Sequence, residues 1–341
     1  MTSLIQETPA GLYCEIGDFY VDPSRRVPRA LITHAHADHA RPGSAKYLAT
    51  REGRRILRTR LGPSAVIDTL SYGEQHLING VTVSFHPAGH ILGSAQVRIE
   101  YRGVVWVVSG DYKIDPDPTC AEFEHVRCHT FITESTFGLP VYRWPAQQEI
   151  FDDINRWWKQ CRDSDQVAVV FAYSLGKAQR VIAGVDSSIG PIYCHPSVEQ
   201  LNQDYRASGI PLQKTWLPTQ APARKSWGGV LLVAPPAIAN SAWLATFGAA
   251  STAMISGWML TRATRRSQTF DRGFPLSDHA DWPGLLKAIE ETQADQILVT
   301  HGESGPLIRW LTESGKDASA LNNQVSETTS SQRWFDFKAA V

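Results

Sequence analysis

The most constraining feature of the sequence is a group of metal-binding side chains directly after a short apolar strand. The segment starts at Arg29 with a predicted apolar strand, and the strand runs into a group that falls within six residues: His34, His36, Asp38 and His39. In an extended loop His34 and His36 can point the same way, and Asp38 and His39 follow on the turn. Imidazole and carboxylate suit zinc, manganese or iron, so the segment can serve two ions. A polar turn with incidental histidines is the alternative.

Further candidate ligands follow other predicted strands. His90 comes after the strand Val81–Phe85, and Asp111 comes after Val104–Val108. An aspartate at the mouth of a strand can bridge two metals through its two oxygens, and His90 would complete the first site. Taken singly, either residue is more often a turn former or a hydrogen-bonded histidine, so the shared placement carries the argument. Asp22 is predicted to orient a ligand imidazole or, alternatively, to be a helix cap or turn residue before Pro23.

The order of predicted elements indicates an α/β protein. Residues up to about 140 show short strands separated by turns, and from Pro145 strands alternate with helices. This alternation is typical of a parallel sheet. After Gly273 a helix near Asp281–Thr292 and a strand at Gln296–Thr300 resemble the first part again, a short helix is predicted after Gly305, and the tail after Ser314 is predicted to be loosely ordered. The elements predicted in the middle are a helix at 150–161, a strand at 167–172, a helix at 175–184, a strand at 192–194, a helix near 198–207, and strands at 229–234 and 253–256.

Composition excludes several classes of protein. The 341 residues carry 33 Lys and Arg against 34 Asp and Glu, so local positive patches would have to hold any polyanion. The apolar runs are far shorter than the ~20 residues that a bilayer span needs, and the N-terminus lacks a cationic start followed by an apolar stretch. The five cysteines are dispersed without a CxxC pair, which predicts neither a disulfide framework nor a thiolate zinc site. We therefore expect a soluble, cytoplasmic protein without a membrane partner.

Several segments resemble known families. HAHADH at 34–39, AGH at 88–90 and SGD at 109–111 resemble the metallo-β-lactamase superfamily, whose four-layer αββα fold holds two metals at the edge of its paired sheets. Within that superfamily, three further segments are similar to motifs A, B and C of the β-CASP nucleases: TEST at 133–136, SDHAD at 277–281 and VTHGE at 299–303. The stretch GLYCEIGDFYVDP, running into ITHAHADHARPGS, looks most like the bacterial ligase-associated DNA exonucleases.

The resemblance implies a fold and a division into domains. The fold would be α/β, a metallo-β-lactamase αββα sandwich with an inserted β-CASP domain made of a parallel sheet flanked by helices. Residues 1–144 and 274–341 would form the discontinuous metallo-β-lactamase domain. Residues 145–273 would form the β-CASP domain.

The resemblance also implies roles for individual residues. One metal would lie on His34, His36 and His90, and the other on Asp38, His39 and His301, with Asp111 between them. The two divalent ions, Zn²⁺ first and Mn²⁺ as the alternative, would activate a hydroxide for in-line attack at phosphorus. His279 would protonate the leaving oxygen, and Glu134 would hold its other nitrogen in the right tautomer. Asp38 counts as both ligand and catalytic residue. Without the motif, His279 is more typical of a helix cap region.

Candidate nucleic-acid-binding residues lie in two places. Lys177 and Arg180 come at a strand-to-helix junction, where backbone amides and a side-chain cation could grip a phosphate. Arg262, Arg265 and Arg266 come shortly before the segment at 277–281 and could contact phosphates. A solvated charged face is the alternative for the arginines.

The expected function is that of a metal-dependent DNA exonuclease in end processing and repair. A DNA ligase and a helicase of the same pathway are the expected partners. The first alternative is an RNA-processing ribonuclease of the mRNA 3′-end type, because a histidine at motif C is linked with the RNA-acting branch. A small-molecule hydrolase of the same superfamily and a catalytically silent scaffold are the others.

Overall fold

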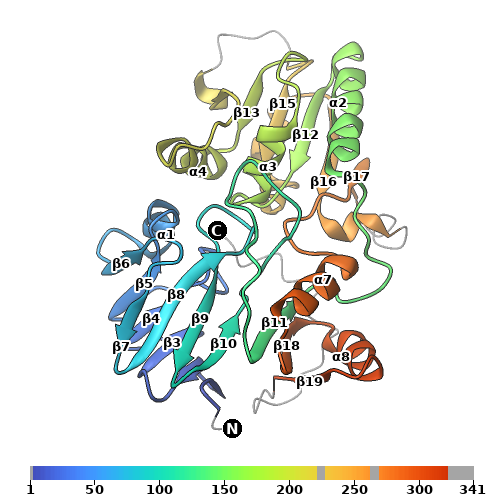
Figure 1. The fold of residues 1–341 in the computed structure, drawn as a ribbon. Coiled ribbons are helices and arrows are strands. Elements are labelled where there is room, and N and C mark those ends of the chain that lie inside the picture. Colours follow the sequence, from blue (N-terminus) through green and yellow to red (C-terminus); the bar gives the residue numbers. More distant parts are fainter. Residues whose placement is uncertain (1–2, 221–226, 262–268, 322–341) are drawn as a thin grey trace. The chain divides into compact units, whose positions relative to one another are not determined.

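The computed structural model describes residues 3–220, 227–261 and 269–321 (Figure 1). The chain forms two compact units. Unit 1 comprises Met1–Arg143 and His279–Ser330, and unit 2 holds Trp144–Asp278. Unit 2 is therefore inserted in the sequence of unit 1.

The first sheet of unit 1 has six strands in the order β1-β2-β3-β4-β5-β6. Strands β1 to β3 pair antiparallel, whereas β3 to β6 pair in parallel. Helix α1 (Arg54–Leu61) joins β5 to β6 and buries Ile56 and Leu57. The strands are Gln6–Thr8, Gly11–Cys14, Phe19–Val21, Arg29–Leu31, Lys46–Thr50 and Ile67–Leu70.

The second sheet of unit 1 has seven strands in the order β19-β18-β11-β10-β9-β8-β7. Strands β7 to β10 pair antiparallel, and β10, β11, β18 and β19 pair in parallel. The sheet joins strands from before and after unit 2 in the sequence. In chain order they are His76–Ile78, Val81–Pro87, Ala95–Tyr101, Val104–Val108, Thr130–Ser135, Gln296–Gly302 and Asp317–Ala320.

The main core of unit 1 lies between its two sheets. Leu31 of the first sheet and Phe85 of the second belong to one buried apolar cluster. Val107 belongs to another cluster, formed by the second sheet with helices α7 (Trp282–Thr292) and α8 (Ser304–Glu313). Successive residues of a strand point to opposite faces, so the strands β10, β11 and β18 contribute side chains to both clusters. Burial of these apolar faces holds the layers together.

The described strands of unit 2 form a sheet in the order β14-β13-β15-β12-β16-β17, of which Figure 1 labels all but β14. All of its strand pairs are parallel. Trp158 and Val181, from the helices α2 and α3, lie in the core cluster of one face. In chain order the elements are α2 (Gln147–Asp163), β12 (Val167–Phe171), α3 (Lys177–Gly184), β13 (Ile192–Cys194), α4 (Pro196–Ala207), β14 (Thr215–Trp216), β15 (Leu231–Ala234), α5 (Ala242–Ala245), β16 (Ala250–Ile255) and β17 (Arg272–Phe274), with short 3₁₀ helices at Pro218–Gln220, Pro236–Ile238 and Gly257–Leu260.

The predicted α/β class is confirmed, and most predicted elements lie within three residues of the observed ones. Helix α3 begins at Lys177 rather than Leu175. The residue before it, Gly176, has φ 84°, and its backbone N–H donates to Gln179 Oε1 at 2.7 Å, so the first turn starts there. None of the described helices is long and apolar enough to cross a bilayer.

The structure corrects the prediction near the C-terminus. Strand β18 continues to Gly302, α8 already begins at Ser304, and the stretch predicted to be loose contains β19. Strand β19 pairs with β18, for example Ala318 with Ile297, and it forms the sheet edge. Its four residues include no large apolar side chain, so the sequence gives only a weak strand signal. Residues after 321 lie outside the described part of the chain.

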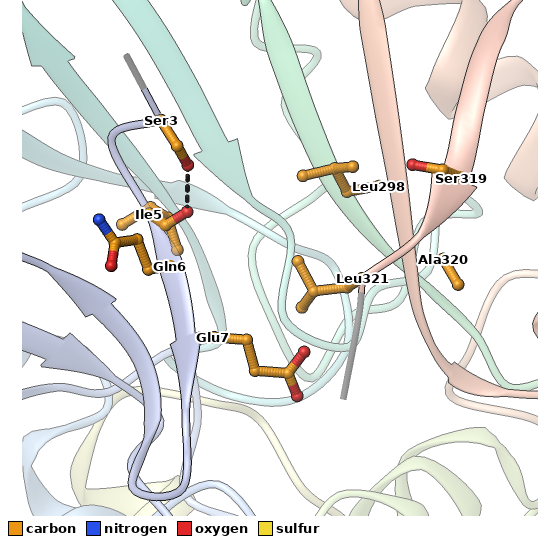
Figure 2. Close-up of a pocket in the computed structure, with 8 residues that line it drawn as sticks. All are labelled: Ser3, Ile5, Gln6, Glu7, Leu298, Ser319, Ala320 and Leu321. Carbon is orange, nitrogen blue, oxygen red and sulfur yellow. Dashed lines mark hydrogen bonds between the residues drawn. The ribbon is translucent and has the colours of Figure 1, made fainter. Parts of the chain in front are cut away.

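One pocket of unit 1 has no candidate site residue in its lining (Figure 2). It is bounded by the β1 region on one side and by β18 and β19 on the other. Its lining residues are Ser3, Ile5, Gln6, Glu7, Leu298, Ser319, Ala320 and Leu321.

Candidate metal centre

Three histidines and an aspartate of unit 1 meet where strands of both sheets end. Nε2 of His34 and Nε2 of His90 each lie 3.1 Å from Nδ1 of His36. Asp111 Oδ2 is 3.5 Å from His34 Nε2 and 3.8 Å from His90 Nε2. Each of the four residues offers one ligand atom, and these atoms all lie within 4.8 Å of one another. The structure thus brings the four residues together as the strand-end argument predicts.

Two glycines allow the turns that deliver these side chains. Gly89 has φ 71°, and a Cβ there would lie 2.0 Å from the backbone oxygen of Lys113. Gly110 has φ 56°, and a Cβ there would lie 2.7 Å from Cβ of Thr33. Each glycine directly precedes a candidate ligand, so the strand ends can turn tightly against neighbouring backbone.

The protonation states of this group suit a cation. Burial, followed by the charges of His39 and other histidines, lowers the pKa of His34 well below its ordinary value, so its imidazole is neutral. Burial alone would raise the pKa of Asp111, but His39 and the other nearby histidines hold it below its usual range. The neutral imidazole of His34 and the ionised carboxylate of Asp111 are the kinds of donor that zinc and similar divalent ions take. The residues present therefore fit a divalent metal ion.

A second group lies beside the first and shares Asp111. His39 Nε2 is 3.5 Å from Asp111 Oδ2 and 3.8 Å from Asp38 Oδ2. The ring of His301 stacks on that of His39, with centroids 5.4 Å apart. Asp38 has 69% of its side chain exposed. Within the described residues neither Asp38 nor His301 joins a set of three ligand atoms within 4.8 Å, so this second group is looser than the first.

Asp22 holds the imidazole of His39 in place. Its Oδ2 lies 2.7 Å from His39 Nδ1, and its Oδ1 accepts the backbone N–H of Thr33 at 2.8 Å. Burial opposes a charge on His39, yet Asp111 and Asp22 raise its pKa to about 10. Because His39 Nδ1 is hydrogen-bonded to Asp22, the other ring nitrogen of His39, Nε2, faces Asp111. Thr33 was not predicted from the sequence, although a threonine directly before two alternate histidines was a usable signal.

His279 and Glu134 form a pair next to the first group. His279 Nδ1 lies 2.9 Å from Glu134 Oε2, and the buried Glu134 accepts the backbone N–H of Tyr112 at 2.8 Å. The His279 and His90 rings are 4.7 Å apart. Asp111, Glu134 and His279 also place one ligand atom each within 4.8 Å of one another. Tyr112 acts through its backbone, which no side-chain pattern could have indicated.

Ser135, like Thr33 and Tyr112, has a role that was not predicted from the sequence. Its hydroxyl donates to the backbone oxygen of His301, whose φ is 51°. The two residues lie at the ends of β11 and β18, which pair in parallel. Ser135 therefore fixes the backbone that carries His301, and its place beside Glu134 was the available signal.

The predicted nucleic-acid-binding residues lie in unit 2 or outside the described chain. Lys177 Nζ forms a 2.9 Å ion pair with Asp278, and Arg180 Nη1 donates to the backbone oxygen of Ser277 at 2.9 Å. Both cations are buried, so the structure gives them internal partners. Their contact with a phosphate stays a prediction. The other predicted residues, Arg262, Arg265 and Arg266, lie outside the described residues.

Three curated proteins show what the chain is similar to. A "Probable DNA ligase" from Opitutus terrae is 30% identical over 323 residues, which is 92% of this chain and 31% of that protein. "Endoribonuclease YSH1" from Gibberella zeae is 28% identical over 177 residues, 50% of this chain and 20% of that protein. "Cleavage and polyadenylation specificity factor 73" from Drosophila melanogaster is 25% identical over 142 residues, which is 33% of this chain and 21% of that protein. The chain spans about a third or less of the length of these relatives.

No protein-family profile matches the sequence. Among solved structures, a protein of unknown function from Enterococcus faecalis has a TM-score of 0.58 over 87% of this chain and 80% of that chain, at 14% identity. A likeness at that identity shows the fold alone. The relatives named as endoribonuclease and as cleavage and polyadenylation factor, together with the ligase-named relative, agree with the resemblance of this chain to the β-CASP nuclease family.

Proposed function

We propose that the protein is a metal-dependent phosphodiesterase that acts on DNA, as an exonuclease in end processing and repair. The observation that supports this most is that two ligand groups share Asp111 Oδ2 beside a His279–Glu134 pair. In this proposal unit 1 is the metallo-β-lactamase αββα sandwich and unit 2 is the β-CASP domain. The two sheets of unit 1 and the parallel sheet of unit 2 support this assignment.

Each group of residues has a part in the proposed hydrolysis. Two divalent ions, Zn²⁺ first and Mn²⁺ second, would acidify a water and neutralise phosphate charge when bound. The first would be held by His34, His36 and His90, the second by Asp38, His39 and His301, with Asp111 shared.

The His279–Glu134 pair would supply the proton that the leaving oxygen needs. His279 presents Nδ1 to Glu134, which fixes the tautomer and leaves Nε2 to hold that proton. An alkoxide is strongly basic, so its departure requires such a donor. Glu134, held by the Tyr112 amide, keeps the ring oriented.

The choice of DNA over RNA rests on the relatives. The protein named as a probable DNA ligase matches 92% of this chain, whereas the endoribonuclease from Gibberella zeae matches 50%. We therefore propose DNA as the substrate in the cytoplasm, with a ligase and a helicase acting in the same pathway.

RNA processing is the second candidate function. The relatives named as endoribonuclease and as cleavage and polyadenylation factor favour it, and so does His301 at the end of β18. Incubation of the protein with labelled single-stranded DNA, duplex DNA and RNA in Zn²⁺ or Mn²⁺ separates the two candidates. The proposal expects DNA shortened from its ends. Cleavage of RNA alone would favour RNA processing. If none of the three substrates is cleaved, both candidate functions are wrong.

A further inference from the structure

The last residues of unit 2 are held by two buried cations of helix α3. Ser277 and Asp278 end unit 2, and His279 follows them in the sequence. Arg180 donates to the Ser277 backbone oxygen, and Lys177 pairs with the Asp278 carboxylate, both at 2.9 Å. All four of these partners are buried. The two residues before the proposed proton donor are therefore fixed by a charge pair and a charge-assisted hydrogen bond.

Helix α3 is itself held rigidly. Gln179 is fully buried, accepts the Gly176 backbone N–H through Oε1 and donates through Nε2 to Asn202 of α4 at 2.9 Å. Asn202 in turn donates to Glu199, which accepts from Arg206 at 3.0 Å. A network of satisfied buried polar groups of this kind rigidifies its surroundings. Lys177 and Arg180 thus extend from a helix whose first turn is tied to α4.

The chain that approaches the pair is also anchored. Phe274 of β17 and Leu276 lie in the apolar core of unit 2, and the Leu276 backbone N–H donates to the Phe274 oxygen at 2.9 Å. Consecutive Cα atoms are ~3.8 Å apart, so a shift of the Asp278 backbone acts directly on the residue that follows it, His279. A misplacement of ~1 Å at a reacting group can cost ~10²-fold in rate.

We propose that Lys177 is a positioning residue for His279. Its ion pair with Asp278, supported by Arg180, would set the backbone from which the proton donor projects. This inference rests on the proposed function, in which His279 protonates the leaving oxygen. It differs from a phosphate grip, because Lys177 would act through Asp278 and never touch nucleic acid.

The test replaces Lys177 by an apolar residue of similar length. Lys177→Met should lower kcat for DNA about 10- to 100-fold with KM unchanged, because only proton delivery is impaired. The rate on a nitrophenyl phosphodiester should stay near the wild-type value, since a phenolate leaves without help. Lys177→Arg should restore part of the DNA rate. Lys159→Met, which removes an exposed lysine of α2, is the matched control and should change neither rate.

Combination with a second variant shows whether Lys177 works through His279. In a His279→Ala background, Lys177→Met should cause no further loss on DNA, because the group it positions is already gone. Three outcomes would each overturn the proposal. The first is that the losses of the two substitutions multiply in the double variant; the second is that Lys177→Met raises KM with kcat unchanged; the third is that Lys177→Met loses equally on both substrates. The second outcome would instead support a grip on phosphate.

Hydrogen exchange supplies a measurement that does not depend on activity. Amides of the segment 275–280 should exchange at least several-fold faster in Lys177→Met than in the wild type or Lys159→Met. Unchanged exchange would contradict the proposal even if the variant were inactive. If the wild-type protein cleaves neither substrate, the proposed function is wrong. Hydrogen exchange would then still show whether Lys177 holds the segment 275–280 in place. Should Lys177→Met not fold, Lys177→Met/Asp278→Asn removes both charges together and takes its place in every assay.

Discussion

Asp111 Oδ2 lies 3.5 Å from Nε2 of both His34 and His39, so one carboxylate oxygen faces two sets of ligands at once. Around it the individual residues differ in how firmly they are held. His34 and His90 are almost fully buried, whereas Asp38 is mostly exposed. At the residue scale we therefore expect the first group to be preformed and the second to tighten only when it binds its ion.

His279 tests the division between proton donor and ligand. His279→Ala should retain both metals and lose about 10²–10⁴ in the rate of DNA cleavage, because the leaving alkoxide loses its donor. A nitrophenyl phosphodiester should be cleaved at nearly the wild-type rate. The control is His34→Ala, which should fail on both substrates. Loss of a metal from His279→Ala, measured by elemental analysis, would make His279 a ligand instead.

Asp22 tests how strongly an oriented imidazole contributes to metal binding. Asp22→Ala removes the acceptor that lies 2.7 Å from His39 Nδ1, so we expect metal affinity to fall by about 10- to 100-fold. Competition with a chelator measures the change. Asp68→Ala removes an exposed carboxylate from β6 and should leave the affinity unaltered. Equal affinities for the two variants would show that Asp22 serves the turn alone.

At the scale of elements, the strand ends and the turns after them build the site. Strands β4, β8 and β10 each lead into a turn that carries a ligand, and Gly89 and Gly110 let two of these turns close against neighbouring backbone. The sheets determine where each turn lies, and the two glycines let the turns pack closely against neighbouring residues. A change at either glycine should thus affect stability and metal binding together.

A pair of glycine variants separates steric overlap from backbone strain. Gly80→Ala keeps a positive φ of 83° with open space around the new Cβ and should cost about 1–2 kcal/mol of unfolding free energy. Gly89→Ala adds the overlap with the Lys113 oxygen and should cost a further amount on the order of 1–3 kcal/mol. Urea unfolding of both variants gives the difference. Equal costs would mean that the Gly89 turn relaxes freely.

Much of the element order was predictable from the sequence. Apolar alternation and helical spacing depend on residues that are close in the chain, so β8, β10, α2 and α7 could be predicted from the sequence. Strand β19 was missed because it carries no large apolar side chain and because its pairing with β18 depends on tertiary contacts. The sequence predicts a phosphate contact for Lys177 and Arg180. Their internal partners could not be predicted, because Ser277 and Asp278 come about 100 residues later.

The whole molecule has a net charge of −1, so any hold on nucleic acid must be local. Replacement of Arg262, Arg265 and Arg266 together by Ala should flatten the slope of log affinity against log salt, by about one unit for each phosphate that the variant no longer neutralises. Arg309→Ala, at an exposed arginine paired with Glu313, is the control and should leave the slope unchanged. An unaltered slope in the triple variant would assign these arginines to a solvated face.

Unit 1 is central to the proposed function because a two-ion centre around Asp111 would lie within it. Anomalous scattering from crystals grown with Zn²⁺, checked by elemental analysis, tests this most directly. We predict two adjacent peaks, one bounded by His34, His36 and His90 and the other by Asp38, His39 and His301, about 3.5–4 Å apart. A fully loaded protein with a single ion and no peak near Asp38 and His39 would contradict the two-ion centre.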